Sequence, residues 1–514
     1  MLTTSGEGLH VIATGATGEN RGSAGDSAMA LRFEGRRTIS LGCSLEELAR
    51  AINGEVLRGD PRKMIGPVAT DSRHMYPGDT FLALKGENHD GSDFLDEAVE
   101  KGAEVLITSA PEKIRCDAAQ CAVVKVGHTH RALLGLASWH KSRSGFRTIC
   151  ITGSCGKTAT KELVSAIYRR CFNVMNTYEN FNNFIGVPIT ILNATRKHSW
   201  AVLELGMNRP GEIGALSRVA RPDIALVTNV LPAHLEGLGS VQGVAREKLS
   251  IFEPLSGDKT AVVNLDDPHI VRFADSIDCK KVGFTLEGLH HGGIDKLVRL
   301  ISWRPSGTGI EFEVETVGSN VEAQGVYRFF CAMPGVGNLQ NLMAAIAVGV
   351  AGGIPLEVMK DAVSTVKSVP GRLYLTRLGG WIIVDDTYNA NPASMKNALS
   401  TLAFWSDAPF RCAILGDMLE LGPGAPEFHR EIGRFAALTG LSMLVAVGRY
   451  ALDIMEGALQ SGMSKEKVMT FDHIDALCQW LSSNAKDAFP GSAWILIKGS
   501  RGMKMEKAIQ AMRG

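Results

Sequence analysis

The sequence has no excess of charge of either sign, no paired cysteines and no long apolar run. Lysine plus arginine and aspartate plus glutamate both number 54, so no overall field favours nucleic acid or an anionic membrane surface. The ten cysteines are scattered singly, which excludes a disulfide-stapled miniprotein and favours the cytoplasm. The longest weakly polar run, Ala344 to Leu356, is shorter than the ~20 residues of a membrane helix. We therefore expect no membrane insertion and a buried helix at that run.

The length of 514 residues exceeds what one hydrophobic core ordinarily holds, and we predict three domains. Residues 1–38, rich in Gly, Ser, Thr and Ala, predict a loose tail, with a targeting peptide as the alternative. Residues 39–127 predict a small α/β domain, residues 128–368 a central domain, and residues 369–514 a C-terminal α/β domain.

Short buried strands alternate with helices in the central domain, which predicts a parallel sheet with helices on both faces. Its predicted strands are Thr148 to Ile151, Ala201 to Leu205, Ile224 to Thr228 and Ala261 to Leu265. Between Leu297 and Phe330 the period changes to two, which predicts antiparallel strands. A second α/β series follows Pro370, with predicted strands Trp381 to Val384, Cys412 to Leu415, Met443 to Val447 and Trp494 to Ile497. The predicted fold class is α/β, with a mixed central sheet and a Rossmann-like C-terminal domain.

A glycine-rich turn connects a predicted strand to the predicted helix Ala159 to Tyr168. Its residues are Gly153, Ser154, Cys155, Gly156, Lys157, Thr158 and Ala159. Such a turn aims backbone N–H groups and the positive end of a helix at phosphate. Lys157 can reach terminal phosphates, and the Thr158 hydroxyl can bind magnesium. Ile151 stands where the first glycine of a P-loop would be, but the pattern still predicts an ATP or GTP site rather than an ordinary turn.

Three further segments accompany this loop: Asp385 to Pro392, Leu415 to Gly422, and Lys498 to Arg501. Together with T-G-x-x-G-K-T they resemble the Mur ligases, over nearly the whole chain outside the tail. The resemblance is to members that join D-alanyl-D-alanine to a UDP-N-acetylmuramoyl-tripeptide. It implies ATP-dependent formation of a C–N bond through an acyl phosphate, two Mg2+ ions, a monomer in the cytoplasm, and a UDP-binding first domain.

The resemblance also assigns metal ligands. Glu204 ends a predicted strand, where a carboxylate can hold magnesium or be an ordinary strand-end acid. His234 reads by itself as a loop histidine, and Lys248, in Arg246-Glu247-Lys248, as part of a solvated helix face. The resemblance implies instead that Thr158, Glu204, His234 and Lys248 bind magnesium, with Lys248 converted by carbon dioxide to a carbamate. A carbamate offers the oxygen ligands that such cations prefer.

Nucleotide and substrate residues are likewise implied by the resemblance. It assigns Arg372 to phosphates and Asp386 to ribose, where a surface ion pair is the alternative. Asn338 and Asn341 match an adenine-contacting segment in which Gly337 replaces the usual histidine. The residues that match UDP-binding segments are Ser72, Arg73, Lys85, Gly86 and Asp90, with a surface hairpin as the alternative.

Asn183 matches the loop that faces the muramoyl peptide. Tyr388, Asn389 and Asn391 are candidates for the incoming dipeptide, because amide side chains can pair with its peptide and carboxylate groups; an asparagine-rich turn is the alternative. His429 and Lys498 to Arg501 match the family without an assigned role. Cys155 departs from the usual loop residue, and we predict that ATP protects it from alkylation.

Two other functions stay open at this stage. One is a sibling or folylpolyglutamate-type ligase that adds a single amino acid, although the Asp-Asn-Pro-Arg typical of the diaminopimelate-adding sibling is missing. The other is a P-loop ATPase scaffold that drives partner binding rather than bond formation. Both would use the nucleotide, but only a ligase would couple its hydrolysis to an amine.

Overall fold

A computed structural model describes residues 38–86, 89–117, 121–318, 325–405 and 407–513. The predicted tail therefore lies outside the described residues, apart from Thr38. The chain divides into two compact units, which are described separately below. Unit 1 consists of the residues up to Leu45 and Val56–Lys125, and unit 2 of Glu46–Glu55 and Val126–Gly514. Within the described residues, no helix is both long and apolar enough to cross a membrane.

Unit 1 is built on a five-stranded sheet of order β1-β5-β4-β3-β2. The strands are β1 (Glu55–Arg58), β2 (Val68–Ala69), β3 (Thr80–Leu82), β4 (Val105–Thr108) and β5 (Ala122–Lys125). Phe81 of β3 and Leu106 of β4 pack against Leu95 and Ala98 of helix α3 (Leu95–Glu100). The short helices η1 (Ser72–His74), η2 (Gly91–Phe94) and η3 (Pro111–Lys113) complete the connections.

The first sheet of unit 2 has nine strands in the order β14-β13-β12-β11-β10-β9-β6-β8-β7. Its parallel strands are β6 (Arg147–Thr152), β7 (Val174–Asn176), β8 (Trp200–Glu204), β9 (Ile224–Val227), β10 (Gly257–Asn264) and β11 (Cys279–Thr285). β12 (Lys296–Ser306) pairs parallel to β11 and antiparallel to β13 (Gly309–Gly318), which pairs antiparallel to β14 (Gly325–Cys331). The predicted change from parallel to antiparallel pairing is confirmed.

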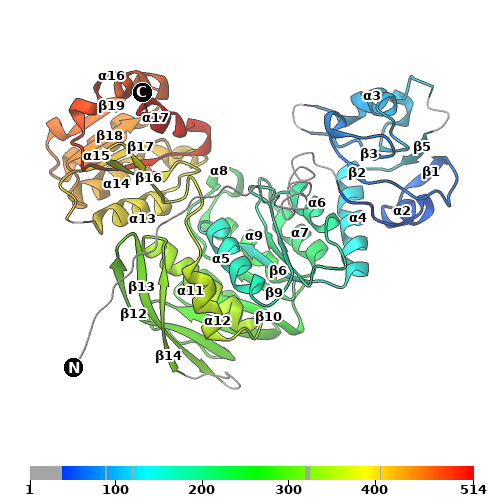
Figure 1. Ribbon diagram of the computed structural model, residues 1–514, viewed down its shortest axis with the longest axis horizontal. Coiled ribbons are helices and arrows are strands. Elements are labelled where there is room, and N and C mark those ends of the chain that lie inside the picture. The colour runs from blue at the N-terminus through cyan, green and yellow to red at the C-terminus, as the bar shows by residue number, and fades with distance from the viewer. Residues whose placement is uncertain (1–37, 87–88, 118–120, 319–324, 406, 514) are drawn as a thin grey trace, which may run out of the picture. The chain divides into compact units, whose positions relative to one another are not determined.

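Helices cover this sheet because their apolar faces need burial. The helices of this part of unit 2 are α4 (Thr129–Ser144), α5 (Lys157–Arg169), α6 (Gly186–Leu192), α7 (Glu212–Ala220), α8 (Leu235–Leu238), α9 (Val241–Leu249), α10 (Pro268–Ala274), α11 (Val336–Ala351) and α12 (Leu356–Ser364). The short helix α2 (Leu45–Ala51) precedes β1 in the chain. α5 and α11 lie side by side (Figure 1), and Leu163, Ile167, Leu342 and Ile346 share one buried core with the sheet.

The apolar run from Ala344 to Leu356 is not one helix. α11 ends at Ala351, and α12 begins only at Leu356. Gly353 has a positive φ of 73°, a conformation open to glycine, and Pro355 lacks the N–H that a continuing helix needs. The prediction of a buried helix is therefore right for the first part of the run and wrong for its end.

The second sheet of unit 2 has six strands in the order β15-β16-β20-β17-β18-β19, of which β15 pairs antiparallel and the others parallel. The strands are β15 (Tyr374–Leu378), β16 (Trp381–Asp386), β17 (Arg411–Gly416), β18 (Met443–Val447), β19 (Val468–Phe471) and β20 (Trp494–Lys498). Its helices are α13 (Pro392–Ala403), α14 (Ala425–Leu438), α15 (Ala451–Gln460), α16 (Ile474–Ala488) and α17 (Glu506–Ala511). These strands and helices form two buried apolar clusters. One contains Leu399 and Leu415, and the other contains Ile383 and Leu481. The predicted α/β series is confirmed.

The register of the nine-stranded sheet gathers three strand ends. Ile151 of β6 lies opposite Glu204 of β8, and Thr152 lies opposite Val227 of β9. Parallel strands end at the same edge of a sheet, which is where ligands collect in open α/β folds. The turn after β6, Glu204 and the segment that leads to His234 therefore begin at one edge.

Candidate active site

Glycine is needed at two positions of the loop between β6 and α5. Gly156 has φ 82° and caps the start of α5, and a Cβ there would lie 2.0 Å from Asn341 Oδ1. Gly153 has φ 152°, and a Cβ there would lie 1.9 Å from Thr228 Oγ1. Cys155 N–H donates to Asn229 Oδ1 at 2.9 Å, and the Thr228 hydroxyl donates to Cys155 O at 2.6 Å. These hydrogen bonds hold the loop in one shape, and α5 begins directly after it. The N-terminus of a helix after such a loop is suited to bind phosphate.

Two lysines converge on this loop. Lys157 Nζ donates to Gly153 O at 2.8 Å, and Lys248 Nζ donates to the same oxygen at 3.0 Å. Burial lowers the pKa of Lys157, an effect that Glu204 opposes and Arg372 reinforces. Burial, and then the charge of Lys157, hold the pKa of Lys248 well below its ordinary value. The Lys248 amine is thereby driven toward its neutral form.

The solvated helix face expected for Arg246-Glu247-Lys248 is wrong for two of the three residues. Arg246 is exposed, but Lys248 is only 1% exposed and Glu247 only 8%. Glu247 accepts hydrogen bonds from Gly211 N–H at 2.7 Å and Ile213 N–H at 2.9 Å. α9 therefore presents Glu247 and Lys248 to backbone groups of the protein, and only Arg246 to water.

Glu204 has one carboxylate oxygen that no protein group satisfies. Its Oε1 accepts a hydrogen bond from Asn182 Nδ2 at 2.8 Å, while Oε2 is buried and without a partner among the described residues. An unsatisfied buried oxygen is costly unless a ligand supplies the missing partner. Among the described residues, no group of three or more His, Cys, Asp or Glu side chains could hold a metal ion. The predicted magnesium ligands are not such a group, because Glu204 and His234 are the only two of them that belong to these residue types. Glu204 Oε2 fits a cation.

His234 lies in the turn before α8, with a left-handed φ of 54°. Its Nδ1 donates to Glu420 Oε2 at 2.6 Å, and this hydrogen bond holds the pKa of Glu420 below its usual value. The hydrogen-bonded loop histidine that the sequence favours by itself is therefore what the structure shows, and its partner is a carboxylate. His234 is 34% exposed at its side chain.

A cleft joins the phosphate loop to the loops of the second sheet. It encloses about 620 Å3 of atom-free space, part of it open to solvent. The lining residues from the first sheet's side are Ser154, Lys157, Ala233 and His234; those from the second are Asn389, Ala390, Asn391, Leu419, Glu420, Leu421, Ser500, Arg501 and Gly502. Predicted phosphate, metal and dipeptide residues thus border one space.

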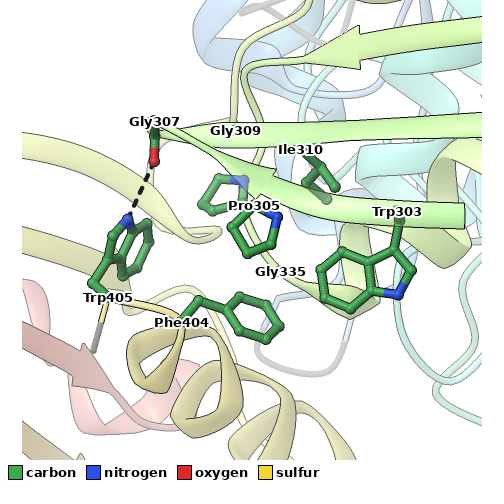
Figure 2. A pocket seen from close by; sticks show the side chains of 9 residues that line it. Trp303, Pro305, Gly307, Gly309, Ile310, Gly335, Phe404 and Trp405 are labelled. Atoms are coloured by element: carbon green, nitrogen blue, oxygen red, sulfur yellow. Dashed lines mark hydrogen bonds between the residues drawn. The ribbon is translucent and has the colours of Figure 1, made fainter. Parts of the chain in front are cut away.

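A second, smaller pocket is aromatic and contains none of the predicted site residues (Figure 2). None of its lining residues is charged: Trp303, Pro305, Gly307, Gly309, Ile310, Pro334, Gly335, Phe404 and Trp405. Trp405 Nε1 donates to Gly307 O at 3.3 Å. This pocket offers no charged group for a phosphate or a carboxylate.

The nucleotide candidates are engaged inside the protein. Asn338 donates to Pro334 O at 2.7 Å, and Asn341 donates to Asn338 Oδ1 at 3.3 Å. The Arg372–Asp386 surface ion pair does not form: Asp386 accepts from Lys498 Nζ at 2.6 Å, and that lysine is buried. Thr158, 7% exposed, lies in the first turn of α5, and Ala159 follows it.

Arg372 instead lies over the Tyr388 ring, 4.0 Å from its centroid. Asn391 caps α13, accepting from Ser394 N–H at 2.9 Å, and its Nδ2 lies 3.1 Å from Cys155 Sγ. The asparagine-rich turn is therefore partly a helix cap, a role that the Asn-Pro pair before a helix could have indicated. Asn389 is exposed at the cleft.

In unit 1, the predicted UDP residues have local partners. Ser72 is buried, and Arg73 is paired with Asp71 at 2.7 Å. Hydrogen bonding by that arginine lowers the pKa of Asp71 to about 2. Lys85 and Asp90 form an antiparallel bridge beside Gly86, whose N–H donates to His89 O at 2.8 Å. Glu87 and Asn88, which follow Gly86 in the chain, lie outside the described residues.

In unit 2, Asn183 is exposed and accepts from Gly186 N–H at 2.9 Å. Its neighbour Asn182, which the sequence analysis passed over, contacts Glu204 instead. No feature of the asparagine run separates the two residues. The sequence also did not indicate that Glu420 contacts His234, although Glu420 lies in the segment Leu415 to Gly422, which resembles the family.

Family models match three parts of the chain: the Mur ligase family catalytic domain over residues 65–140, the Mur ligase middle domain over 151–349, and the Mur ligase glutamate ligase domain over 371–501. UDP-N-acetylmuramoyl-tripeptide--D-alanyl-D-alanine ligase of Escherichia coli is 33% identical over 484 residues, covering 91% of this chain and 98% of that protein.

Solved structures give the same likeness. A crystal structure of MurF from Acinetobacter baumannii superimposes with a TM-score of 0.81 at 30% identity, covering 92% of this chain and 99% of the other. MurF ligase from Thermotoga maritima, solved in complex with ADP, gives a TM-score of 0.73 at 27% identity over 87% and 96% of the two chains. On the fold, the geometry of the loop and these likenesses, the chain belongs to the Mur ligase family.

Proposed function

We propose that this protein uses ATP to join D-alanyl-D-alanine to UDP-N-acetylmuramoyl-tripeptide. The observation that carries the ligase chemistry is Glu204 Oε2, which is buried beside the phosphate loop of Lys157 and has no hydrogen-bond partner in the part of the chain that the structure describes. The substrates are those in the name of the Escherichia coli relative, of which this chain covers 98%. The nucleotide follows from the loop and from the ADP bound to the Thermotoga maritima relative.

The start of α5 supplies the phosphate grip. The first N–H groups of a helix have no partner within the helix and carry partial positive charge. Lys157 would exchange its hydrogen bond to Gly153 O for one to a terminal phosphate. Arg372, which lies near enough to lower the pKa of Lys157, would supply a second cation. Asp386 would receive the ribose, and Asn338 and Asn341 would line the adenine side.

Magnesium would be held by Glu204, Thr158, His234 and a carbamate on Lys248. The ions supply neutralisation of the crowded phosphate oxygens during transfer. Asn182 orients the Glu204 carboxylate so that Oε2 stays free for a cation. Thr158, in the first turn of α5, offers a hydroxyl next to the phosphate grip.

The carbamate is supported by the surroundings of Lys248. Carbon dioxide reacts with a neutral amine, and burial together with Lys157 lowers the pKa of this one. Carbamylation would give Lys248 a negative charge beside the Lys157 ammonium, with which it shares the Gly153 carbonyl. Protein incubated with 13C-bicarbonate should give a carbamate carbon signal that Lys248→Met removes. A spectrum unchanged by that substitution would rule the carbamate out.

The reaction has two steps. The terminal carboxylate of the tripeptide takes the γ-phosphoryl group of ATP, which forms an acyl phosphate and releases ADP. The amine of D-alanyl-D-alanine then attacks the acyl carbon: the C–N bond forms, the C–O bond to phosphate breaks, phosphate leaves with the electron pair, and the nitrogen loses a proton. Tyr388, Asn389 and Asn391 would hold the dipeptide in the cleft, away from competing water.

Ser72, Arg73, Lys85, Gly86 and Asp90 would bind the UDP group of the substrate, and Asn183 its peptide. Arg73 is suited to a diphosphate because its guanidinium, 77% exposed at the side chain, is free to exchange Asp71 for a phosphate. Arg73→Ala should raise KM for the UDP-tripeptide without changing KM for ATP.

The test of the whole proposal is ADP production with each amine offered in turn. ADP should form only when UDP-tripeptide and D-alanyl-D-alanine are both present, and Lys157→Ala should abolish it. Turnover with a single amino acid would favour the sibling or folylpolyglutamate-type ligase. ADP production that ignores both substrates would favour the ATPase scaffold.

A further inference from the structure

The segment Leu415 to Gly422 has no role in the chemistry described above, yet hydrogen bonds join it to three other parts of the chain. Met418 N–H donates to His429 Nε2 at 2.9 Å, and Leu419 N–H donates to Ser500 Oγ at 2.9 Å. The Asp417 carboxylate accepts from Arg449 N–H at 2.9 Å. The segment is therefore fixed to α14, to the turn after β18 and to the turn after β20.

His429 serves this purpose through a defined tautomer. It is fully buried, and its Nδ1 donates to Ala425 O at 2.6 Å, so that Nε2 is free to accept from Met418. Its ring stacks on Tyr450 at 4.5 Å between centroids. The histidine that the family resemblance left without a role is a structural support of the segment.

The supported segment presents Glu420 to the metal candidate. Glu420 has φ 62° and His234 has φ 54°, both in the left-handed region that residues other than glycine rarely adopt. Besides the 2.6 Å contact between the two side chains, Glu236 N–H donates to Glu420 O at 3.4 Å. Side chain and backbone of Glu420 thus both contact the turn that carries His234.

We propose that Glu420 is a positioning residue that fixes His234 for magnesium. A carboxylate accepts only, so Nδ1 carries the proton of this hydrogen bond. In the neutral imidazole, Nε2 is then the ring nitrogen whose lone pair can bind the ion. Metal-binding histidines ordinarily have such a partner on the second ring nitrogen, and it raises metal affinity. This inference rests on the proposed function, because that function makes His234 a ligand.

A consequence is that the second sheet helps to complete the metal site of the first. Glu420 follows β17, whereas His234 follows β9. An exposed ion pair by itself adds little to stability, so the loss of Glu420 should affect magnesium far more than folding. The support from His429 and Ser500 holds the carboxylate in place before any ligand binds.

The test compares Glu420→Ala, Glu420→Gln and the control Glu427→Ala, which removes an exposed carboxylate from α14. Binding of Mn2+ with ADP is measured by electron paramagnetic resonance, without peptide substrates. Glu420→Ala should weaken Mn2+ binding ~10- to 100-fold, at an unchanged melting temperature. Glu420→Gln keeps an acceptor oxygen and should recover most of the affinity, and Glu427→Ala should match wild type.

Equal Mn2+ affinity in Glu420→Ala and wild type would overturn the proposal, as would equal losses in Glu420→Ala and Glu427→Ala. The proposal would also be overturned if Glu420→Gln recovered no Mn2+ affinity and the Glu420 variants melted at a lower temperature than wild type, since that pattern indicates a structural role. Failure of the proposed function is seen separately, as wild-type protein that binds Mn2+ and ADP but makes no amide from UDP-tripeptide and D-alanyl-D-alanine.

Discussion

Replacing Gly156 by alanine tests the shape of the phosphate loop most sharply. Alanine at φ 82° costs about 1–2 kcal/mol, because its Cβ crowds the backbone in left-handed conformations. The same Cβ would lie 2.0 Å from Asn341 Oδ1, and forced overpacking costs about 1–3 kcal/mol. The amide of Asn341 cannot move freely, since it is bonded to Asn338 and Thr160 at 3.3 Å each. The expected total is about 2–5 kcal/mol.

The two contributions can be separated with Asn341→Ala. That substitution removes the obstructing oxygen but leaves the backbone strain, so the double variant should be about 1–3 kcal/mol more stable than the sum of the single changes predicts. The free energy of local opening is measured by native-state hydrogen exchange of the peptide over residues 147–170, which contains β6 and α5. Additive losses, within about 0.5 kcal/mol, would refute the packing of Gly156 against Asn341.

Three other perturbations follow from the geometry. Lys498→Met leaves the Asp386 carboxylate buried without its cation, and should destabilise the second sheet by about 3–5 kcal/mol in urea unfolding. Adding Asp386→Leu should recover most of this loss. A loss under about 1 kcal/mol in Lys498→Met alone would contradict the buried ion pair. In a Cys171→Ser background, iodoacetamide should label Cys155 and ATP should prevent it, because the residue lies in the phosphate loop; labelling insensitive to ATP would remove the prediction. The pKa of Asp71 is lowered from 3.8 to about 2 in the folded state, so its contribution is complete above about pH 4 and lost as the pH falls to 2. The stability difference between wild type and Asp71→Asn, followed by hydrogen exchange in unit 1, should shrink over that range, and a constant difference would argue against it.

Strands and the phosphate loop could be predicted because their causes are local. Buried parallel strands such as Ile224–Val227 are continuous apolar runs, and the loop needs glycine wherever φ is positive. The end of α11 was also readable in principle, since Gly353 and Pro355 interrupt the apolar run.

Partners that come from distant segments could not be predicted. Lys248 lies in a charged helical stretch that is typical of a solvated face, and only the fold brings it to Gly153 O. Asn182 and Asn183 are neighbouring residues of the same type, yet it is Asn182 that donates a hydrogen bond to Glu204. Glu420 meets His234 across 186 residues of sequence, a separation over which periodicity carries no information.

The central claim is that Glu204, His234 and Lys248 gather divalent cations at the phosphate loop. It is tested most directly by anomalous diffraction from crystals grown with Mn2+ and ADP. The account predicts a Mn2+ peak in contact with Glu204 Oε2 and a second peak in contact with His234. A fully occupied nucleotide on the loop with no Mn2+ peak at either side chain would contradict it.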